Sequence, residues 1–408
     1  MRTFVGSSKN RKGSRGVAGM SAYFFLFAAS LSAYTSFVSL WQSRALGQGP
    51  MLIGVLSSSS ALAAFVAQPA LSLLADRSRA KNTVLWALLA AQAAAALLHL
   101  WARHWVAVAA VMAAYTAVQG AALALSNAVI LDNLRRDDAV ERFGSVRLSY
   151  SWGFALSAAL AGVLAGRSVN LVFVLCAAVS LAALPVSLLM GRVPGAQKAK
   201  SRRMGLRELL RYRQFWFFVA FSLCLHITHS LSICFLPLYF ADLNAPSWVY
   251  GLGIFAMAAA ETPFLLGSGR LMKRLSVRKM LLLPGFAFVL RWSLTALCST
   301  WVQLLPLYVL HGGGIIVVYF ALSCYVSDEL PEELSATGQA VVNSAVVSLS
   351  RVVGALLGGV LSGSIGMRNT FWCMAALSAV ATAALLLSIF KNKERGTEPG
   401  EVIQEGQR

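Results

Sequence analysis

The sequence contains little charge, and especially little negative charge. Only 12% of its 408 residues are charged, 58% are hydrophobic, and the mean hydropathy is +0.67. Average soluble domains have about a quarter of their residues charged. This composition excludes a water-soluble globule of this size, and it excludes disordered and collagen-like chains as well. The chain is therefore expected to have lipid as its main solvent.

Acidic residues are scarcer than basic ones, with 16 Asp+Glu against 35 Lys+Arg and a net charge of +19. A basic excess indicates nucleic-acid binding when it forms a face of a folded domain. Here the basic residues separate apolar blocks, so no nucleic-acid partner is expected.

The motifs of metal sites, disulfide frameworks and common enzymes are missing. The six cysteines lie in or beside long apolar runs, and no CxxC pair occurs. This pattern favours small apolar packing residues over a metal site or disulfides. No Walker loop, GxSxG or HExxH motif occurs, so we expect no cofactor, no ATP-driven pumping and no enzymatic hydrolysis.

Long apolar runs make up most of the chain. A bilayer core of about 30 Å needs about 20 helical residues. Because backbone groups in lipid must bond within the chain, we expect helices in these runs and an all-α membrane protein with twelve transmembrane helices. The predicted spans are 17–42, 52–74, 83–102, 105–131, 145–166, 169–190, 214–240, 249–269, 279–299, 302–327, 338–363 and 368–390.

The positions of lysine and arginine predict the orientation in the membrane. Nearly all of them fall in the tails and loops of one side, and only Arg44, Arg103, Arg167 and Arg368 fall on the other. Cytoplasmic loops carry the Lys/Arg excess. We therefore expect a multi-pass protein of the cell inner membrane with both termini in the cytoplasm.

The longest polar interruption follows the sixth span and divides the chain into two six-helix halves. Part of it, RELLRYR, is either a basic amphipathic helix on the anionic leaflet or a solvated linker. The predicted segments are an N-terminal tail (1–16), a first bundle (17–190), a linker (191–213), a second bundle (214–390) and a C-terminal tail (391–408).

A short basic loop follows the second span of each half. It reads SLLADRSRAK at 72–81 and GRLMKRLSVRK at 269–279. Such a repeat is typical of duplicated transporters, and the loops resemble the major facilitator superfamily signature Gly-x-x-x-Asp-Arg-x-x-x-Arg/Lys, with Ser72 in place of Gly. The resemblance implies that Asp76 and Arg77 latch the cytoplasmic side shut. The alternative is that the basic residues only fix topology.

Other segments are similar to the phenylpropionate permease branch of this superfamily and, more loosely, to its lactose permease and nucleoside symporter branches. In sugar-carrying permeases, a Trp seven residues after the helix-five Arg stacks on the sugar. Phe154 stands at that position and argues against a galactoside. The resemblance implies a monomer. The segments are FGSVRLSYSWGFALSAALAG (143–162), YGLGIFAMAAAE (250–261), RLMKRLSVRKMLLLPGFAFVLRWSLTA (270–296) and LHGGG (310–314).

Four ionisable residues fall well inside predicted spans, namely Glu261, Arg291, His311 and Arg351. A charge there costs at least about 2.5–3.5 kcal/mol, so each is expected to face the bundle interior and to have a partner. Glu261 is the predicted proton carrier, Arg291 its partner and His311 the third member of a relay, and the family resemblance implies the same roles. The alternative is an ion pair that only fixes helix packing.

The mid-span charges and polar residues predict the substrate contacts. One positive charge is in excess, which favours an anionic substrate held by Arg351 or by Arg147, unless Asp132 or Asp328 pairs with these arginines. His226 and His229 share a helix face but lack a third metal ligand, so we expect no metal and predict substrate contacts instead. Asn127, Asn343, Gln119 and Gln339 either contact substrate or join helices, and Phe154 either lines the cavity or packs.

These features predict a secondary active transporter that works by alternating access, with a small-molecule substrate and protons as its partners and lipid around it. Proton symport of an aromatic or other carboxylic acid is the leading hypothesis. Symport of a nucleoside or oligosaccharide and efflux by proton antiport are alternatives. A non-transporting membrane sensor is the alternative of another class, and Glu261 argues against it because a buried carboxylate is costly.

Overall fold

The structure is a computed structural model that describes residues 6–136, 142–194, 206–274, 276–311 and 314–394. In these ranges the chain forms helices joined by short turns, and no strand occurs. The fold is therefore all-α, as the composition predicts. The ends of both predicted tails, residues 195–205 of the linker and Gly312–Gly313 of the LHGGG segment lie outside the described residues.

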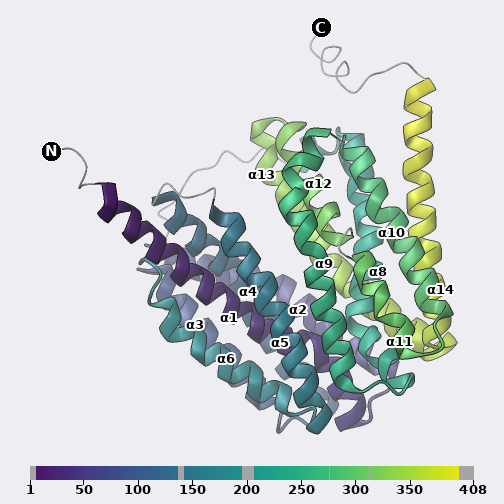
Figure 1. Ribbon diagram of the computed structural model, residues 1–408, viewed down its shortest axis with the longest axis horizontal. Helices are drawn as coiled ribbons and strands as arrows, with labels where there is room; N and C mark the ends of the chain where they lie inside the picture. The colour runs from purple at the N-terminus through teal and green to yellow at the C-terminus, as the bar shows by residue number, and fades with distance from the viewer. Residues whose placement is uncertain (1–5, 137–141, 195–205, 275, 312–313, 395–408) are drawn as a thin grey trace.

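Two groups of helices follow one another along the chain and form two bundles (Figure 1). The first bundle contains α1 (Gly6–Leu46), α2 (Pro50–Arg77), α3 (Lys81–Leu98), α4 (Trp105–Arg136), α5 (Phe143–Arg167) and α6 (Leu171–Ser187). The second contains α7 (Leu206–Leu209), α8 (Arg213–Asp242), α9 (Ser247–Arg274), α10 (Val277–Leu297), α11 (Trp301–Leu304), the 3₁₀ helix η2 (Pro306–His311), α12 (Ile315–Asp328), α13 (Glu332–Val341), the π-helix η3 (Val342–Leu349) and α14 (Ser350–Glu394).

The helices match the predicted spans. Nine helical segments of the described chain are long and apolar enough to cross a membrane, and one of them, Glu333–Phe390, is long enough for two crossings. Gly366 divides that segment, because its φ of 81° lies in the left-handed region that glycine tolerates. Together with α6 and the 28-residue α9, these segments account for the twelve spans.

The tenth span is broken, which hydropathy alone does not predict. The chain forms one turn of α11, then η2, and resumes an α-helix at Ile315. A Cβ added to Gly314 would lie 2.5 Å from a ring carbon of Phe288, so this position has no room for a larger residue. Broken helices in transporters expose backbone and side chains at binding sites. Here the break places His311 at the end of η2.

The linker ends in a single helical turn rather than in an amphipathic helix. α7 spans only Leu206–Leu209, and the indole of Trp216 on α8 donates a hydrogen bond to the Leu209 carbonyl at 3.0 Å. Leu209 is buried. The turn is therefore fixed to the second bundle by burial and by a hydrogen bond.

The two bundles pack most closely at the end opposite the described chain ends. A Cβ added to Gly54 on α2 would lie 2.6 Å from the carbonyl oxygen of Ala355 and from the Cα of Gly359 on α14. On α9, a Cβ added to Gly251 would lie 2.4 Å from the carbonyl oxygen of Ala158 on α5. Only glycine allows backbones to approach this closely.

The hydrophobic core shows the same asymmetry. The larger cluster contains residues of both bundles, such as Phe37 of α1 and Tyr250 of α9, whose rings meet edge to face at 5.6 Å. The second cluster, which includes Met20 and Leu134, contains only residues up to Val193. The bundles share a core at one end and spread apart toward the end where both termini lie (Figure 1).

Candidate functional site

Glu261, His311 and Arg291 form a cluster inside the second bundle. The Oε1 atom of Glu261 on α9 lies 3.7 Å from Nε2 of His311. The guanidinium of Arg291 on α10 donates a hydrogen bond to Nδ1 of His311. His311 and Arg291 are each only 2% exposed, and the side chain of Glu261 is 18% exposed. The structure therefore brings together the three residues predicted to form the relay.

The hydrogen bond from Arg291 determines what His311 can do. Because Nδ1 accepts, a neutral imidazole must carry its proton on Nε2, the nitrogen that faces Glu261. The Nε2–H group therefore points toward Glu261 as a donor, opposite a carboxylate oxygen that can accept. The three side chains lie in sequence, with Arg291 hydrogen-bonded to His311 and His311 3.7 Å from Glu261, so a change of charge on one of them acts on the other two.

Aromatic rings hold Arg291 in place. Its guanidinium carbon lies 4.6 Å from the ring centroid of Trp292 and 5.3 Å from that of Tyr308. The Trp292 indole is in turn fixed by a hydrogen bond to Thr228 at 3.1 Å. Cation–π contacts of this kind are strongest where water is excluded. They compensate part of the cost of burying the guanidinium.

The two histidines of α8 have different environments. The ring of His229 lies 4.9 Å from that of His311, and its Nδ1 has no hydrogen-bond partner among the described residues. His226 uses its Nδ1 in a 2.9 Å bond to the Ser222 carbonyl of its own helix. His229 therefore adjoins the cluster with an unused nitrogen, whereas His226 is partly committed to the backbone.

Arg147 and Tyr150 of α5 approach the site from the first bundle. The Arg147 guanidinium lies 4.2 Å from the ring centroid of Tyr150 and interacts electrostatically with Glu261 across the interface. Tyr150 also interacts electrostatically with Arg351 of the second bundle. Charges of both bundles thus meet at one place.

Arg351 stands at the start of α14, directly after the π-helix η3. π-Helical turns are frequent at functional sites. Its side chain is exposed and interacts electrostatically with His226 and His229. No acidic side chain of the described chain lies within ion-pair distance of it, and Asp132, one alternative partner, pairs with Lys81 at 3.0 Å instead.

The remaining predicted residues form no hydrogen bond, ion pair or ring contact with this cluster among the described residues. Phe154 packs partly buried against the larger core, and Asn127 is half-buried on α4. Asn343 on η3 donates to the Gln339 carbonyl at 3.0 Å and accepts from Tyr319 at 3.5 Å. Arg77 is exposed at the end of α2, and the side chain of Asp76 lies outside the described residues.

Two site residues, Tyr150 and Tyr308, were not predicted from the sequence. Tyr150 follows Arg147 by three residues, a spacing that places both on one helix face. Tyr308 has a buried hydroxyl for which the described residues provide no hydrogen-bond partner. Within the same residues, no group of three His, Cys, Asp or Glu side chains is arranged to hold a metal ion.

Two membrane-spanning bundles with ionisable side chains at and beside their interface are typical of secondary transporters. The model of the MFS_1 like family matches residues 18–373, and the chain belongs to this family. It is thus a solute permease of the major facilitator superfamily rather than an enzyme, as predicted.

Curated relatives carry permease names. The chain is 23% identical to a raffinose permease of Escherichia coli over 90% of its length and 91% of the relative's. It is 25% identical to a probable 3-phenylpropionic acid transporter of Escherichia coli (strain K12), over 59% of the chain and 63% of the relative. A melibiose permease of Enterobacter cloacae is 22% identical over 93% of both chains.

Solved structures share the fold. The nucleoside transporter NupG superposes with a TM-score of 0.77 at 18% identity, covering 91% of this chain and 98% of that one. A bacterial homologue of the human lysosomal transporter Spinster, in an inward-facing conformation, superposes with a TM-score of 0.71 at 12% identity, covering 92% and 96%. At these identities the similarity establishes the fold alone.

Proposed function

We propose that the protein is a proton-coupled symporter of a carboxylic acid, most specifically an aromatic one. The observation that carries this proposal is the charge balance of the site. Arg147 and Arg351 lie on opposite bundles without an ion-pair partner in the described chain, next to a Glu261–His311–Arg291 cluster that can carry a proton.

The substrate carboxylate supplies the missing negative charge. A guanidinium binds a carboxylate through two parallel hydrogen bonds. Because each bundle contributes one arginine, a single substrate carboxylate could bind both bundles at once. The Tyr150 ring, which packs against Phe24 at 4.8 Å, offers an aromatic face beside Arg147. The 3-phenylpropionic acid transporter among the relatives supports an aromatic acid, and Phe154 argues against galactoside stacking.

Proton transfer through Glu261 couples transport to the membrane potential. The Arg147 charge acts on Glu261 from the first bundle, so a substrate anion that binds Arg147 changes the charge that Glu261 experiences. One elementary charge that crosses 100 mV gains about 2.3 kcal/mol, which corresponds to about 50-fold accumulation. One proton in excess of the substrate charge is sufficient for such uptake.

The orientation of the protein in the membrane, the residues that close its cytoplasmic side, and its oligomeric state are also part of the proposal. The basic loops favour an inner membrane location with both termini cytoplasmic, so the bundles meet on the outer side and separate toward the cytoplasm. Asp76 and Arg77, the last two residues of α2, latch the cytoplasmic side shut during the cycle. The working unit is a monomer with bundles at 17–190 and 214–390.

Proton movement in proteoliposomes tests the proposal. A panel of phenylpropionate and other aromatic acids, nucleosides and galactosides is added outside, and external pH is recorded. We expect alkalinisation with an aromatic acid, loss of this signal in Glu261→Gln, and no loss in the control Glu333→Gln, whose side chain is exposed on α13.

Other outcomes separate the alternatives. A response to galactosides or nucleosides but not to acids would overturn the substrate class and keep the symporter. Acidification of the external medium, the opposite of the expected change, would identify proton antiport and therefore efflux. A Glu261→Gln variant that still moves protons with substrate would refute the role of Glu261.

A further inference from the structure

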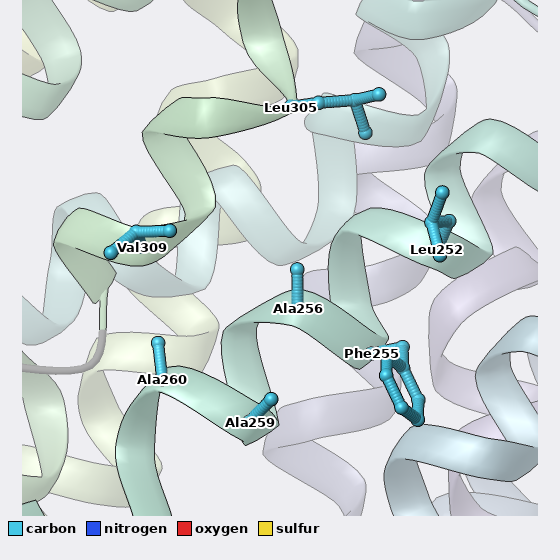
Figure 2. A pocket seen from close by; sticks show the side chains of 7 residues that line it. All are labelled: Leu252, Phe255, Ala256, Ala259, Ala260, Leu305 and Val309. Carbon is cyan, nitrogen blue, oxygen red and sulfur yellow. The ribbon is translucent and has the colours of Figure 1, made fainter. Parts of the chain in front are cut away.

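A groove lies on the outer surface of the second bundle, between α9 and the broken tenth span (Figure 2). It has a volume of about 570 Å³, and all of its lining side chains are apolar. Three of them are alanines of α9, so the floor of the groove is the bare surface of that helix. The lining residues are Leu252, Phe255, Ala256, Ala259, Ala260, Leu305 and Val309.

The groove lies at the depth of the hydrocarbon core. From Leu252 to Ala260 it follows α9 for about 12 Å, close to half of a bilayer core of about 30 Å. Leu252 of α9 and Val309 of the broken tenth span are exposed at its rim. Water in such a groove would find no polar partner. Hydrocarbon is therefore the chemistry that fits it.

The groove and the ionisable cluster share two structural elements. Ala260 of α9 and Val309 of η2 line the groove from opposite sides, as Figure 2 shows. Their near neighbours Glu261 and His311 approach each other to 3.7 Å. A change in the separation of α9 and η2 would therefore also move these two side chains relative to each other.

η2 is the element that most needs a support. 3₁₀ helices have poorer hydrogen-bond geometry than α-helices, and irregular backbone within the membrane requires cover. Val309 is nevertheless 62% exposed. The rim residue Phe255 contacts Trp152 of the first bundle, with ring centroids 5.9 Å apart. The groove therefore borders the interface between the bundles.

We propose that this groove binds one acyl chain of a membrane phospholipid and that the bound chain holds η2 against α9. The chain covers the exposed face of η2, adds dispersion contacts along the alanine floor, and keeps the Glu261–His311 pair at its observed separation. The binding site does not depend on which solute the protein carries.

Photo-crosslinking tests the site. The protein is reconstituted with phosphatidylethanolamine that carries a diazirine in one acyl chain, irradiated and mapped by peptide mass spectrometry. We expect adducts at 252–260 and 305–309 in excess of those on the exposed α14 residues Val380 and Leu387. Ala259→Leu, which fills the groove, should reduce the groove adducts several-fold and leave the α14 adducts unchanged.

Controls keep the outcome decisive. Ala256→Leu fills the same groove from another position and replaces Ala259→Leu if that variant does not fold. Adducts that scale with exposure alone, or that persist in the filled variants, would overturn the proposal. Labelling by a diazirine fatty acid without labelling by the phospholipid would overturn the choice of phospholipid.

Hydrogen exchange tests the support of η2. Adding phospholipid to delipidated protein should slow amide exchange at 307–311 several-fold in the wild type. In Ala259→Leu the leucine replaces the chain, so exchange should be slow from the start and insensitive to lipid. An equal lipid effect in both proteins would show that the chain does not hold η2.

Discussion

Replacement of Arg351 by glutamine tests the proposed anion site most directly. The side chain is exposed and has no ion-pair partner in the described chain, so its removal leaves no buried acid unpaired. The fold should therefore tolerate Arg351→Gln with a change in unfolding free energy within about 0.5 kcal/mol.

The loss of affinity follows from the contact that the arginine supplies. A hydrogen bond to a charged group contributes about 1.5–3 kcal/mol, which corresponds to about a 10- to 150-fold increase in Kd. The loss should affect 3-phenylpropionate and not its neutral amide, because only the acid presents a charge to the guanidinium.

Isothermal titration of detergent-purified protein measures both ligands on each variant. Arg167→Gln, which removes an exposed arginine at the end of α5, is the matched control and should bind like the wild type. Equal affinity of Arg351→Gln and wild type for the acid would refute the anion site. Equal losses for acid and amide would show that Arg351 acts through packing.

Three further substitutions test other parts of the structure. Tyr150→Leu removes the ring under a guanidinium and should weaken aromatic-acid uptake by about 2- to 30-fold in KM, given cation–π energies of about 0.5–2 kcal/mol, whereas Tyr150→Phe should not. Gly251→Ala forces the bundles apart where a Cβ would lie 2.4 Å from a carbonyl oxygen. Alkylation of Cys234, whose Sγ lies 3.5 Å from a serine hydroxyl of the first bundle, should then be faster, and an unchanged rate would contradict the close packing. Lys81→Ala breaks a partly exposed ion pair with Asp132, so thermal unfolding should detect a loss of at most about 1 kcal/mol while transport persists.

Hydropathy was sufficient to predict the spans but not their interruptions. The residues of η2 and η3 are as apolar as those of neighbouring α-helices, so composition does not distinguish 3₁₀ or π turns from α turns. The glycines after His311 are visible in the sequence, but residues 302–327 were predicted to form one unbroken span. The close fit of Gly314 against Phe288 depends on packing between helices, which the sequence does not show.

The site residues that could be predicted from the sequence are those whose charge is costly to place within the membrane. Glu261, Arg291 and His311 stood out because ionisable groups in lipid need partners. His226 and His229 share a helix face, and only the rotamers of the structure show which one has an unused nitrogen. Tyr150 and Tyr308 were missed because aromatic residues in spans more commonly face lipid or pack helices.

The glycine contacts give the molecule a mechanical axis. One contact joins α2 to α14 and the other joins α5 to α9, so a line through both passes between the bundles. Atoms near that line barely move when the bundles rotate about it, whereas the ends of the helices farthest from it move most. The start of α5 is about 23 Å from Ala158 along the helix, so a rotation of about 15° displaces it by about 6 Å. The glycines at the axis can thus stay in van der Waals contact while the distant helix ends separate and open a passage.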